Sequence, residues 1–124
     1  MSARTIGMDF DYTPKQREIY DLVGELGKTH FAPRAAEYDE KTVTPVANMR
    51  DFIDAGLAGL TVSEDLGGLG SGAMGRDPLL YIIAIEQTAR YCMSTAHSLH
   101  IHCHGSHLID QICSPAQRKN ILGN

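Results

Sequence analysis

Histidine is the residue type in this chain best suited to chemistry, because its ring exchanges protons and binds metal ions near neutral pH. Five of the six histidines in the 124-residue chain lie between residues 94 and 113. Four of these would share one side of a helix, within a band of about 80°: His97, His100, His104 and His107. The spacing therefore predicts a helix with one face rich in imidazole rings.

Metal binding is one interpretation of this face. Histidines four residues apart on a helix can bind one ion, so His100 and His104 are plausible ligands. The candidates for a third ligand are His97, His107 and Cys103. Zinc sites usually also recruit a carboxylate or a thiolate, and Asp110 is the only carboxylate near this face. We therefore favour a second interpretation, in which the rings lie at a boundary between packed elements and each makes a hydrogen bond.

Catalysis by a nucleophile is less well supported. Cys92, Cys103 or Ser106 could each act beside a histidine, but the chain has no Gly-x-Ser-x-Gly sequence, and neighbours within one helix rarely align as nucleophile and base. Glu86 is either a buried general base or the partner of Arg90, four residues further on. The sequence leaves both roles of Glu86 open.

Two adjoining helices must position these side chains. Residues 78–91 (PLLYIIAIEQTARY) are apolar on all sides, which predicts a helix covered by several neighbours. Residues 94–113 form the histidine-rich helix, with Ser94 as its cap. Each flank of that helix carries apolar side chains that we expect to be packed: Ile101, Leu108 and Ile112 on one flank, and Ala96, Leu99 and Cys103 on the other.

The rest of the chain also has helical patterns. Thr-Pro-x-Gln at 13–16 and Ser-Pro-x-Gln at 114–117 are typical helix starts, and the first helix should kink at Pro33. A short helix should begin at Pro45 and end at Gly56, and a glycine-rich loop should follow over residues 57–75. We expect at least one of Gly67 and Gly68 to have a positive φ. The fold class is all-α, with about five helices.

Length, charge and cysteine content limit the classes of protein. The length predicts one domain, and a formal charge of -4 without a basic cluster argues against nucleic acid or an anionic membrane as partner. No apolar run reaches the roughly 18–20 residues that cross a bilayer, and the N-terminus does not look like a signal peptide. The three cysteines show no CxxC spacing, so free thiols and a cytoplasmic protein are expected.

Three segments resemble the N-terminal helical domain of the acyl-CoA dehydrogenase family. They are residues 31–40 (FAPRAAEYDE), residues 56–70 (GLAGLTVSEDLGGLG) and residues 114–122 (SPAQRKNIL), in the order and spacing of that family. The glycine-rich loop is the most specific of the three, and the resemblance covers nearly the whole chain, from about Phe10 to Leu122. It implies an up-and-down orthogonal bundle over residues 1–124, with the β domain and the C-terminal helical domain of the family outside this chain.

The resemblance also implies a function for the parent protein. Family members are flavoenzymes in which FAD lies between the β domain and the C-terminal helices, and they dehydrogenate an acyl-CoA with the help of an electron acceptor. This chain alone is then expected to be inactive, to supply one wall of the acyl-chain cavity, and to belong to a homo-oligomer. The positions that resemble the lining of the cavity are Thr95, Leu99, His100 and Cys103. The alternative is a stand-alone helical interaction module that binds metal through His100 and His104.

Overall fold

The structure is a computed structural model that describes residues 10–71 and 77–123. Within these residues the chain forms six α-helices and no strand, which confirms the all-α fold class. They are α1 (Pro14–Leu26), α2 (Ala32–Lys41), α3 (Val46–Asp54), α4 (Pro78–Ala89), α5 (Met93–Ile112) and α6 (Pro115–Leu122). The expected number of about five is reached when α1 and α2 are counted as one long helix. No helix of the described residues is long and apolar enough to cross a membrane.

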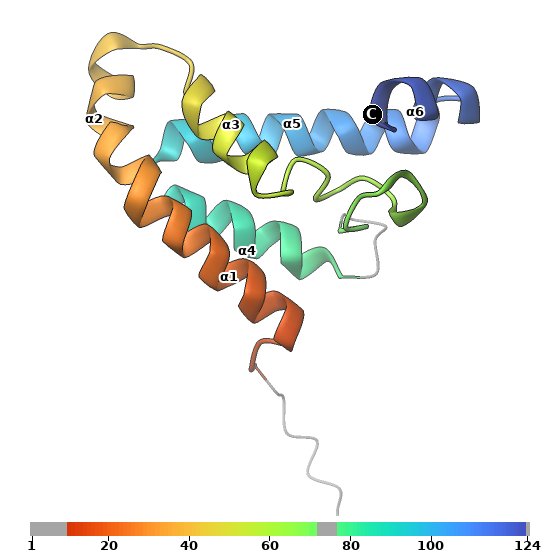
Figure 1. Cartoon of the computed structure of the whole chain (residues 1–124), viewed down its shortest axis with the longest axis horizontal. Helices are drawn as coiled ribbons and strands as arrows, with labels where there is room; N and C mark the ends of the chain where they lie inside the picture. The colour runs from red at the N-terminus through yellow and green to blue at the C-terminus, as the bar shows by residue number, and fades with distance from the viewer. Residues whose placement is uncertain (1–9, 72–76, 124) are drawn as a thin grey trace, which may run out of the picture.

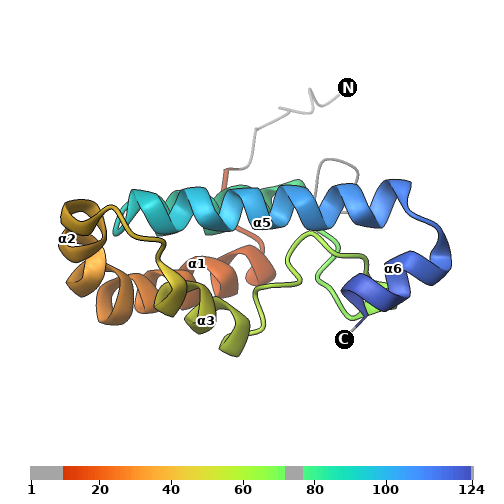
Figure 2. The same cartoon turned by 90° about the horizontal axis from the view of Figure 1, so that it is seen from above.

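The longest helix, α5, runs along the whole molecule. In Figure 1, α4 lies below it, and α1 lies against α4 at an angle to α5. The short helix α6 folds back beside the far end of α5, near the loop that follows α3 (Figure 2). One side of α5 therefore faces the core, and its other side faces solvent.

The starts of the helices follow the capping sequences. The side chain of Thr13 accepts a hydrogen bond from the amide of Gln16 at 3.2 Å, while the Gln16 side chain accepts one from the Thr13 amide at 3.0 Å. Residues 114–117 repeat this arrangement at α6, so both capping boxes are confirmed. The expected cap at Ser94 is wrong, because the carbonyl of Cys92 already accepts the Ala96 amide at 3.1 Å and Ser94 lies inside the first turn.

The expected kink at Pro33 takes another form. A π-helical turn, Gly27–Phe31, joins α1 to α2 just before the proline, and the Ala32 amide donates to the carbonyl of Gly27. Such a wide turn accommodates the missing amide of a proline without breaking the helix. Gly27 is also fixed by packing, because a Cβ there would lie 2.1 Å from the ring of Tyr91.

The core lies between α1, α3, α4, α5 and the loop after α3. Its aromatic centre is the pair Phe31 and Phe52, whose ring centroids are 5.0 Å apart. The buried hydrophobic side chains around them include Ile19, Val23, Leu57, Leu60, Leu80, Ile83, Leu99 and Cys103. All three cysteines are free, as expected, and two of them are buried.

The solvent-facing sides of α4 and α5 correct two predictions. Leu79 and Ile82 of α4 are about half exposed, so α4 is not covered on all sides. On α5, three apolar side chains that we call the apolar stripe are exposed rather than packed: Ile101 at 56%, Leu108 at 46% and Ile112 at 76%. The helical period shows which residues share a face but not which face the rest of the domain covers.

Glu86 is also exposed, so the interpretation as a buried general base is wrong. Its expected partner, Arg90, instead donates hydrogen bonds to the hydroxyl of Tyr20 at 3.2 Å and to the side-chain carbonyl of Gln87 at 3.1 Å. Arg90 therefore ties α4 to α1, and Glu86 takes no part in a site built from these residues.

Candidate functional site

The candidate site is α5, whose buried side holds it in place and whose exposed side carries the histidines. The buried side is formed by residues at helical spacing: Thr95, Ala96, Leu99, Cys103, Ser106 and Asp110. Three of the four residues that resemble the cavity lining, Thr95, Leu99 and Cys103, belong to this side and are 0% exposed. The fourth, His100, lies on the exposed side. The structure therefore brings three of these positions together and separates the fourth from them.

Thr95 uses its hydroxyl inside the domain. It accepts a hydrogen bond from the side-chain amide of Asn48 at 2.8 Å and donates toward the sulfur of Cys92 at 3.1 Å. Asn48 is itself buried, and its carbonyl oxygen accepts from the guanidinium of Arg34 at 2.7 Å. This chain of polar contacts fixes the start of α5 against α3 and α2.

Cys103 holds the middle of α5 against the loop that follows α3. Its backbone carbonyl accepts a hydrogen bond from the hydroxyl of Thr61 at 2.8 Å. Burial raises the pKa of the Cys103 thiol to about 11, and a hydrogen bond with Thr61 opposes this only in part. The thiol is therefore protonated near neutral pH, and it is suited neither to nucleophilic attack nor to binding a metal ion on the histidine face.

The exposed side carries a cluster that we call the Tyr81–His100–His104 cluster. The phenol of Tyr81, on α4, is hydrogen-bonded to Nδ1 of His100. The rings of His100 and His104 meet edge to face, with centroids 6.0 Å apart. His97 is exposed one turn earlier and His107 is half-buried. The sequence predicted the histidines of this face, but it gave no indication that Tyr81 on the preceding helix would join them.

Two physical effects act on the phenol of this cluster. Partial burial raises the pKa of Tyr81, and the nearby thiol group of Cys103 raises it further. The phenol therefore keeps its hydrogen at neutral pH, and the tautomer of His100 decides whether the phenol donates to Nδ1 or accepts from it.

The described residues contain no group of three or more His, Cys, Asp and Glu side chains placed to hold a metal ion. Cys103 points into the core, and Asp110, the carboxylate expected nearest to the histidines, is used elsewhere. Its oxygens accept hydrogen bonds from the amide and hydroxyl of Ser63, and from the guanidinium of Arg118 at 2.8 and 2.5 Å. The metal interpretation of His100 and His104 therefore gains no third ligand from these residues.

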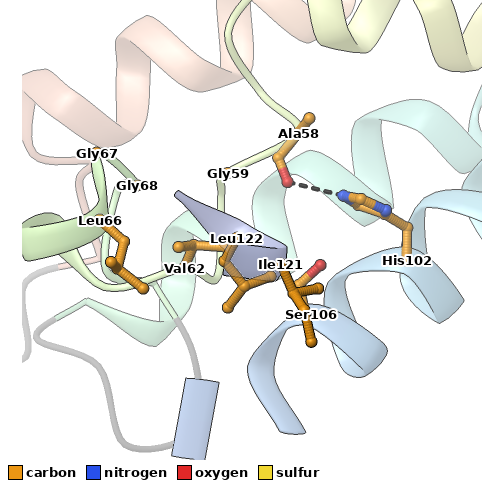
Figure 3. Close-up of a pocket in the computed structure, with 10 residues that line it drawn as sticks. All are labelled: Ala58, Gly59, Val62, Leu66, Gly67, Gly68, His102, Ser106, Ile121 and Leu122. Atoms are coloured by element: carbon orange, nitrogen blue, oxygen red, sulfur yellow. Dashed lines mark hydrogen bonds between the residues drawn. The ribbon is translucent and has the colours of Figure 1, made fainter. Parts of the chain in front are cut away.

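A pocket of about 300 Å³ lies on the opposite side of α5, between the glycine-rich loop and α6 (Figure 3). His102 and Ser106 form its α5 wall, and Nε2 of His102 is 2.8 Å from the carbonyl oxygen of Ala58. Apolar side chains of the loop and of α6 close it: Val62, Leu66, Ile121 and Leu122. The sequence did not indicate this pocket, because its walls come from three segments far apart in the chain.

Gly67 and Gly68 of the glycine-rich loop are required for two different physical reasons. Gly67 has φ +85°, which confirms the expected positive φ. Gly68 is required sterically, because a Cβ there would lie 2.0 Å from the carbonyl oxygen of Val62. Loop amides such as those of Leu69 and Gly70 donate to carbonyls within the loop. The described part of the glycine-rich loop, up to Ser71, therefore packs on itself and does not offer a ring of free amides to a phosphate.

The described residues do not fit a flavin dinucleotide. Three pockets on these residues measure about 300 to 410 Å³, at the lower end of the roughly 300–1,000 Å³ that suits drug-sized ligands, and FAD is larger than such ligands. The described amides of the glycine-rich loop donate to carbonyls of the same loop, so they are not available to a pyrophosphate. A flavin would need residues beyond the described part of this chain.

Comparisons with known proteins assign the domain. Residues 13–124 match the family model described as acyl-CoA dehydrogenase, N-terminal domain. The short-chain-specific acyl-CoA dehydrogenase of Clostridium acetobutylicum is 34% identical over 95 residues, which cover 77% of this chain and 24% of that protein. The benzylmalonyl-CoA dehydrogenase of Aromatoleum aromaticum is 35% identical over 89 residues, 72% of this chain and 22% of that protein.

A solved structure agrees with the sequence relatives. A chain from a solved structure described as the electron transferring flavoprotein of Acidaminococcus fermentans superposes on this domain with a TM-score of 0.78 and 27% sequence identity. The superposition covers 94% of this chain and 30% of that chain. The present chain spans about a quarter of the length of the curated relatives it matches. The family match covers nearly all of the described residues, including α1 to α6 and the glycine-rich loop. The chain therefore belongs to the acyl-CoA dehydrogenase family, and residues 13–124 correspond to its N-terminal domain.

Proposed function

We propose that this chain is the N-terminal helical domain of a longer, FAD-dependent enzyme that dehydrogenates an acyl-CoA thioester at the α and β carbons. The observation that carries the proposal is the family match over residues 13–124, in a chain about a quarter as long as its relatives. The flavin and the catalytic base would come from the β domain and the C-terminal helical domain. The poor fit of a flavin to the described residues supports this division of labour.

We further propose that α5 supplies one wall of the acyl-chain cavity. His100 would present its ring to the cavity from the exposed side of the helix. Thr95, Leu99 and Cys103 would act from behind, because their contacts with Asn48, the core and Thr61 fix the helix that carries His100. In this proposal the buried side of α5 holds the helix in place, and its exposed side presents polar side chains.

An independent helical module that binds metal through His100 and His104 is a weaker proposal. The described residues offer no group of three possible ligands, and two histidines alone rarely hold zinc in competition with water. The long family match also favours a part of a larger enzyme over a module with its own function.

The remaining features of the parent enzyme are proposals that follow from the same family. Its partners would be an acyl-CoA and an electron acceptor, and the parent would be a homo-oligomer. The exposed apolar stripe of α5 is consistent with further contacts, either to other domains or to another copy. The free thiols Cys92, Cys103 and Cys113 favour a reducing compartment, and we propose the cytoplasm.

The decisive experiment compares the 124-residue chain with the complete polypeptide encoded by its reading frame. The complete polypeptide should purify yellow and should reduce an artificial electron acceptor when an acyl-CoA is added. The 124-residue chain should be colourless and inactive. A colourless complete polypeptide that fails with acyl-CoA esters of every length would refute the proposal, and a yellow 124-residue chain would refute the division of labour.

A further inference from the structure

Ser106 of α5 has a buried hydroxyl group without a partner. The residue is 8% exposed, and no hydrogen bond joins its side chain to any residue that the structure describes. By contrast, the hydroxyls of Ser63, Ser71 and Ser98 all form hydrogen bonds within the domain. Buried hydroxyl groups are normally hydrogen-bonded, because an unpaired one loses water and gains nothing in return. In Figure 3 the side chain of Ser106 lies in the wall of the pocket between the glycine-rich loop and α6, so its hydroxyl is available to a molecule that enters this pocket.

The shape of the pocket is fixed by contacts within the domain. Nε2 of His102 is 2.8 Å from the carbonyl oxygen of Ala58 (Figure 3). A carbonyl oxygen only accepts, so this nitrogen carries the hydrogen and ties α5 to the start of the loop. On the loop itself, the carbonyl of Val62 accepts from the amide of Gly70 at 2.8 Å. The walls are therefore in place before a ligand arrives.

The chemistry of the walls favours an uncharged ligand. His102 is the only titratable side chain that lines the pocket. The charged groups of Asp110 and Arg118, on the two helices that border it, are 2.5 Å apart and pair with each other. A charged ligand would lose its water in the pocket without gaining an ion partner, which is unfavourable.

The volume and the remaining walls limit the ligand further. A dry cavity of about 150 Å³ accepts benzene, so a pocket of about 300 Å³ has room for one ring or a short branched chain with a small substituent. The side chains that would cover the body of such a molecule are apolar: Val62, Leu66, Ile121 and Leu122. Their contact would remove apolar surface of the ligand from water, which favours binding.

We propose that this pocket binds a small uncharged molecule with an apolar body and one hydroxyl group, such as a phenol or a short branched alcohol. The oxygen of the ligand pairs with the hydroxyl of Ser106, which can donate and accept. The body of the ligand fills the space between the loop and α6. The inference adds a ligand site to the domain and does not use the flavin or the acyl-CoA of the proposed function.

The test titrates the 124-residue chain with three probes of matched shape: 4-methylphenol, toluene and 4-methylbenzoate. Two-dimensional NMR of the backbone amides gives both the Kd and the place of binding. 4-Methylphenol should bind saturably and shift amides around the pocket, such as those of Gly59, Gly68 and Leu122. Toluene should bind more weakly, because it leaves the hydroxyl of Ser106 unpaired. 4-Methylbenzoate should not bind, because its charge finds no partner.

Substitutions of Ser106 separate the hydroxyl from the space around it. Ser106→Ala should raise the Kd of 4-methylphenol about three- to tenfold, the effect of one lost hydrogen bond, and should change that of toluene by about twofold or less. Ser106→Leu should abolish binding of both probes, because its side chain fills the pocket. The matched control is Ser98→Ala on the same helix, whose hydroxyl donates to the carbonyl of Ser94 at 2.9 Å. It should leave both Kd values unchanged.

Four results would overturn the inference. They are the absence of saturable binding of 4-methylphenol, a Kd for toluene as low as that for 4-methylphenol, shifts centred outside the pocket, and an unchanged Kd in Ser106→Ala. The same titration of the complete polypeptide adds a fifth, since loss of binding there would show that another domain fills the pocket. None of these results bears on flavin binding or on activity with acyl-CoA, so the proposed function is tested separately.

Discussion

Asp110 should be the single carboxylate on which the stability of this domain depends most. Its side chain is 2% exposed and accepts hydrogen bonds from the amide of Ser63 at 3.1 Å, from the Ser63 hydroxyl, and from Arg118 at 2.8 and 2.5 Å. These contacts join three segments, because Ser63 belongs to the glycine-rich loop and Arg118 to α6. Replacing Asp110 should loosen the loop and α6 together.

The size of the effect follows from this geometry. Breaking a buried ion pair by removing one partner costs about 3–5 kcal/mol, and Arg118, at 22% exposed, can recover part of this by contacting water. We therefore expect Asp110→Ala to lower the free energy of unfolding by about 2–3 kcal/mol. In a double-mutant cycle with Arg118→Gln, the coupling energy should be about 1–2 kcal/mol. Far-UV circular dichroism in urea suits the measurement, because the chain has no tryptophan.

The pH dependence of the same variants gives an independent check. Burial raises the pKa of Asp110, but the hydrogen bonds from Ser63 and Arg118 outweigh burial and leave the pKa below its ordinary value. The stabilisation is therefore fully present well above the unfolded pKa of about 3.9, and is lost as the pH falls through the lower pKa of the folded state. The difference in stability between the wild type and Asp110→Asn should shrink accordingly in acid.

A matched control is Glu18→Gln, which breaks the exposed pair of Glu18 and Lys15. It should change the free energy of unfolding by about 0.5 kcal/mol or less. The reasoning fails if Asp110→Ala is no more destabilising than this control. It also fails if the wild type and Asp110→Asn keep a constant difference from pH 7 to pH 3.

Three further predictions concern the loop, the thiols and the surface. Gly67→Ala should lower the free energy of unfolding by about 1 kcal/mol, because the residue has a positive φ. Gly68→Ala should lower it more, because its Cβ would lie 2.0 Å from a backbone carbonyl oxygen. Urea unfolding of both variants measures the two losses, and equal losses would contradict this prediction. Half-buried Cys113 should react with iodoacetamide at pH 8 well before Cys103, which is buried and whose thiol has a pKa of about 11. Mass spectrometry of the alkylated peptides measures the order, and equal or faster reaction of Cys103 would contradict the prediction. The 124-residue chain should self-associate through the apolar stripe of α5, in sedimentation runs with or without a chelator; a monomer, or association lost with the chelator, would contradict this.

Local signals predicted the helices well because each acts within a few residues. The capping boxes at Thr13 and Ser114 satisfy amides of the same turn, so the sequence alone was enough to place both starts. The end of α3 at Gly56, with φ +74°, depends on one residue in the same way. Pro33 predicted a departure from regular helix at this place, but not that it would take the form of a π-helical turn, whose Gly27 packs against Tyr91 from a distant part of the chain.

The candidate site was predicted only in part, because its geometry depends on which side of α5 is covered. Leu99 and Ile101 are both apolar and lie two positions apart, yet Leu99 is 0% exposed and Ile101 is 56% exposed. Period and hydrophobicity cannot distinguish a face covered by this domain from a face that another domain or copy would cover. The resemblance to the family grouped His100 with Thr95 in one expected lining, although Thr95 is buried and His100 is exposed on another side of the helix. The sequence did determine which histidines share the exposed side, whereas the partner of His100 is Tyr81 on the neighbouring helix α4. The geometry of this exposed side therefore depends on the α4–α5 contact as much as on α5 itself.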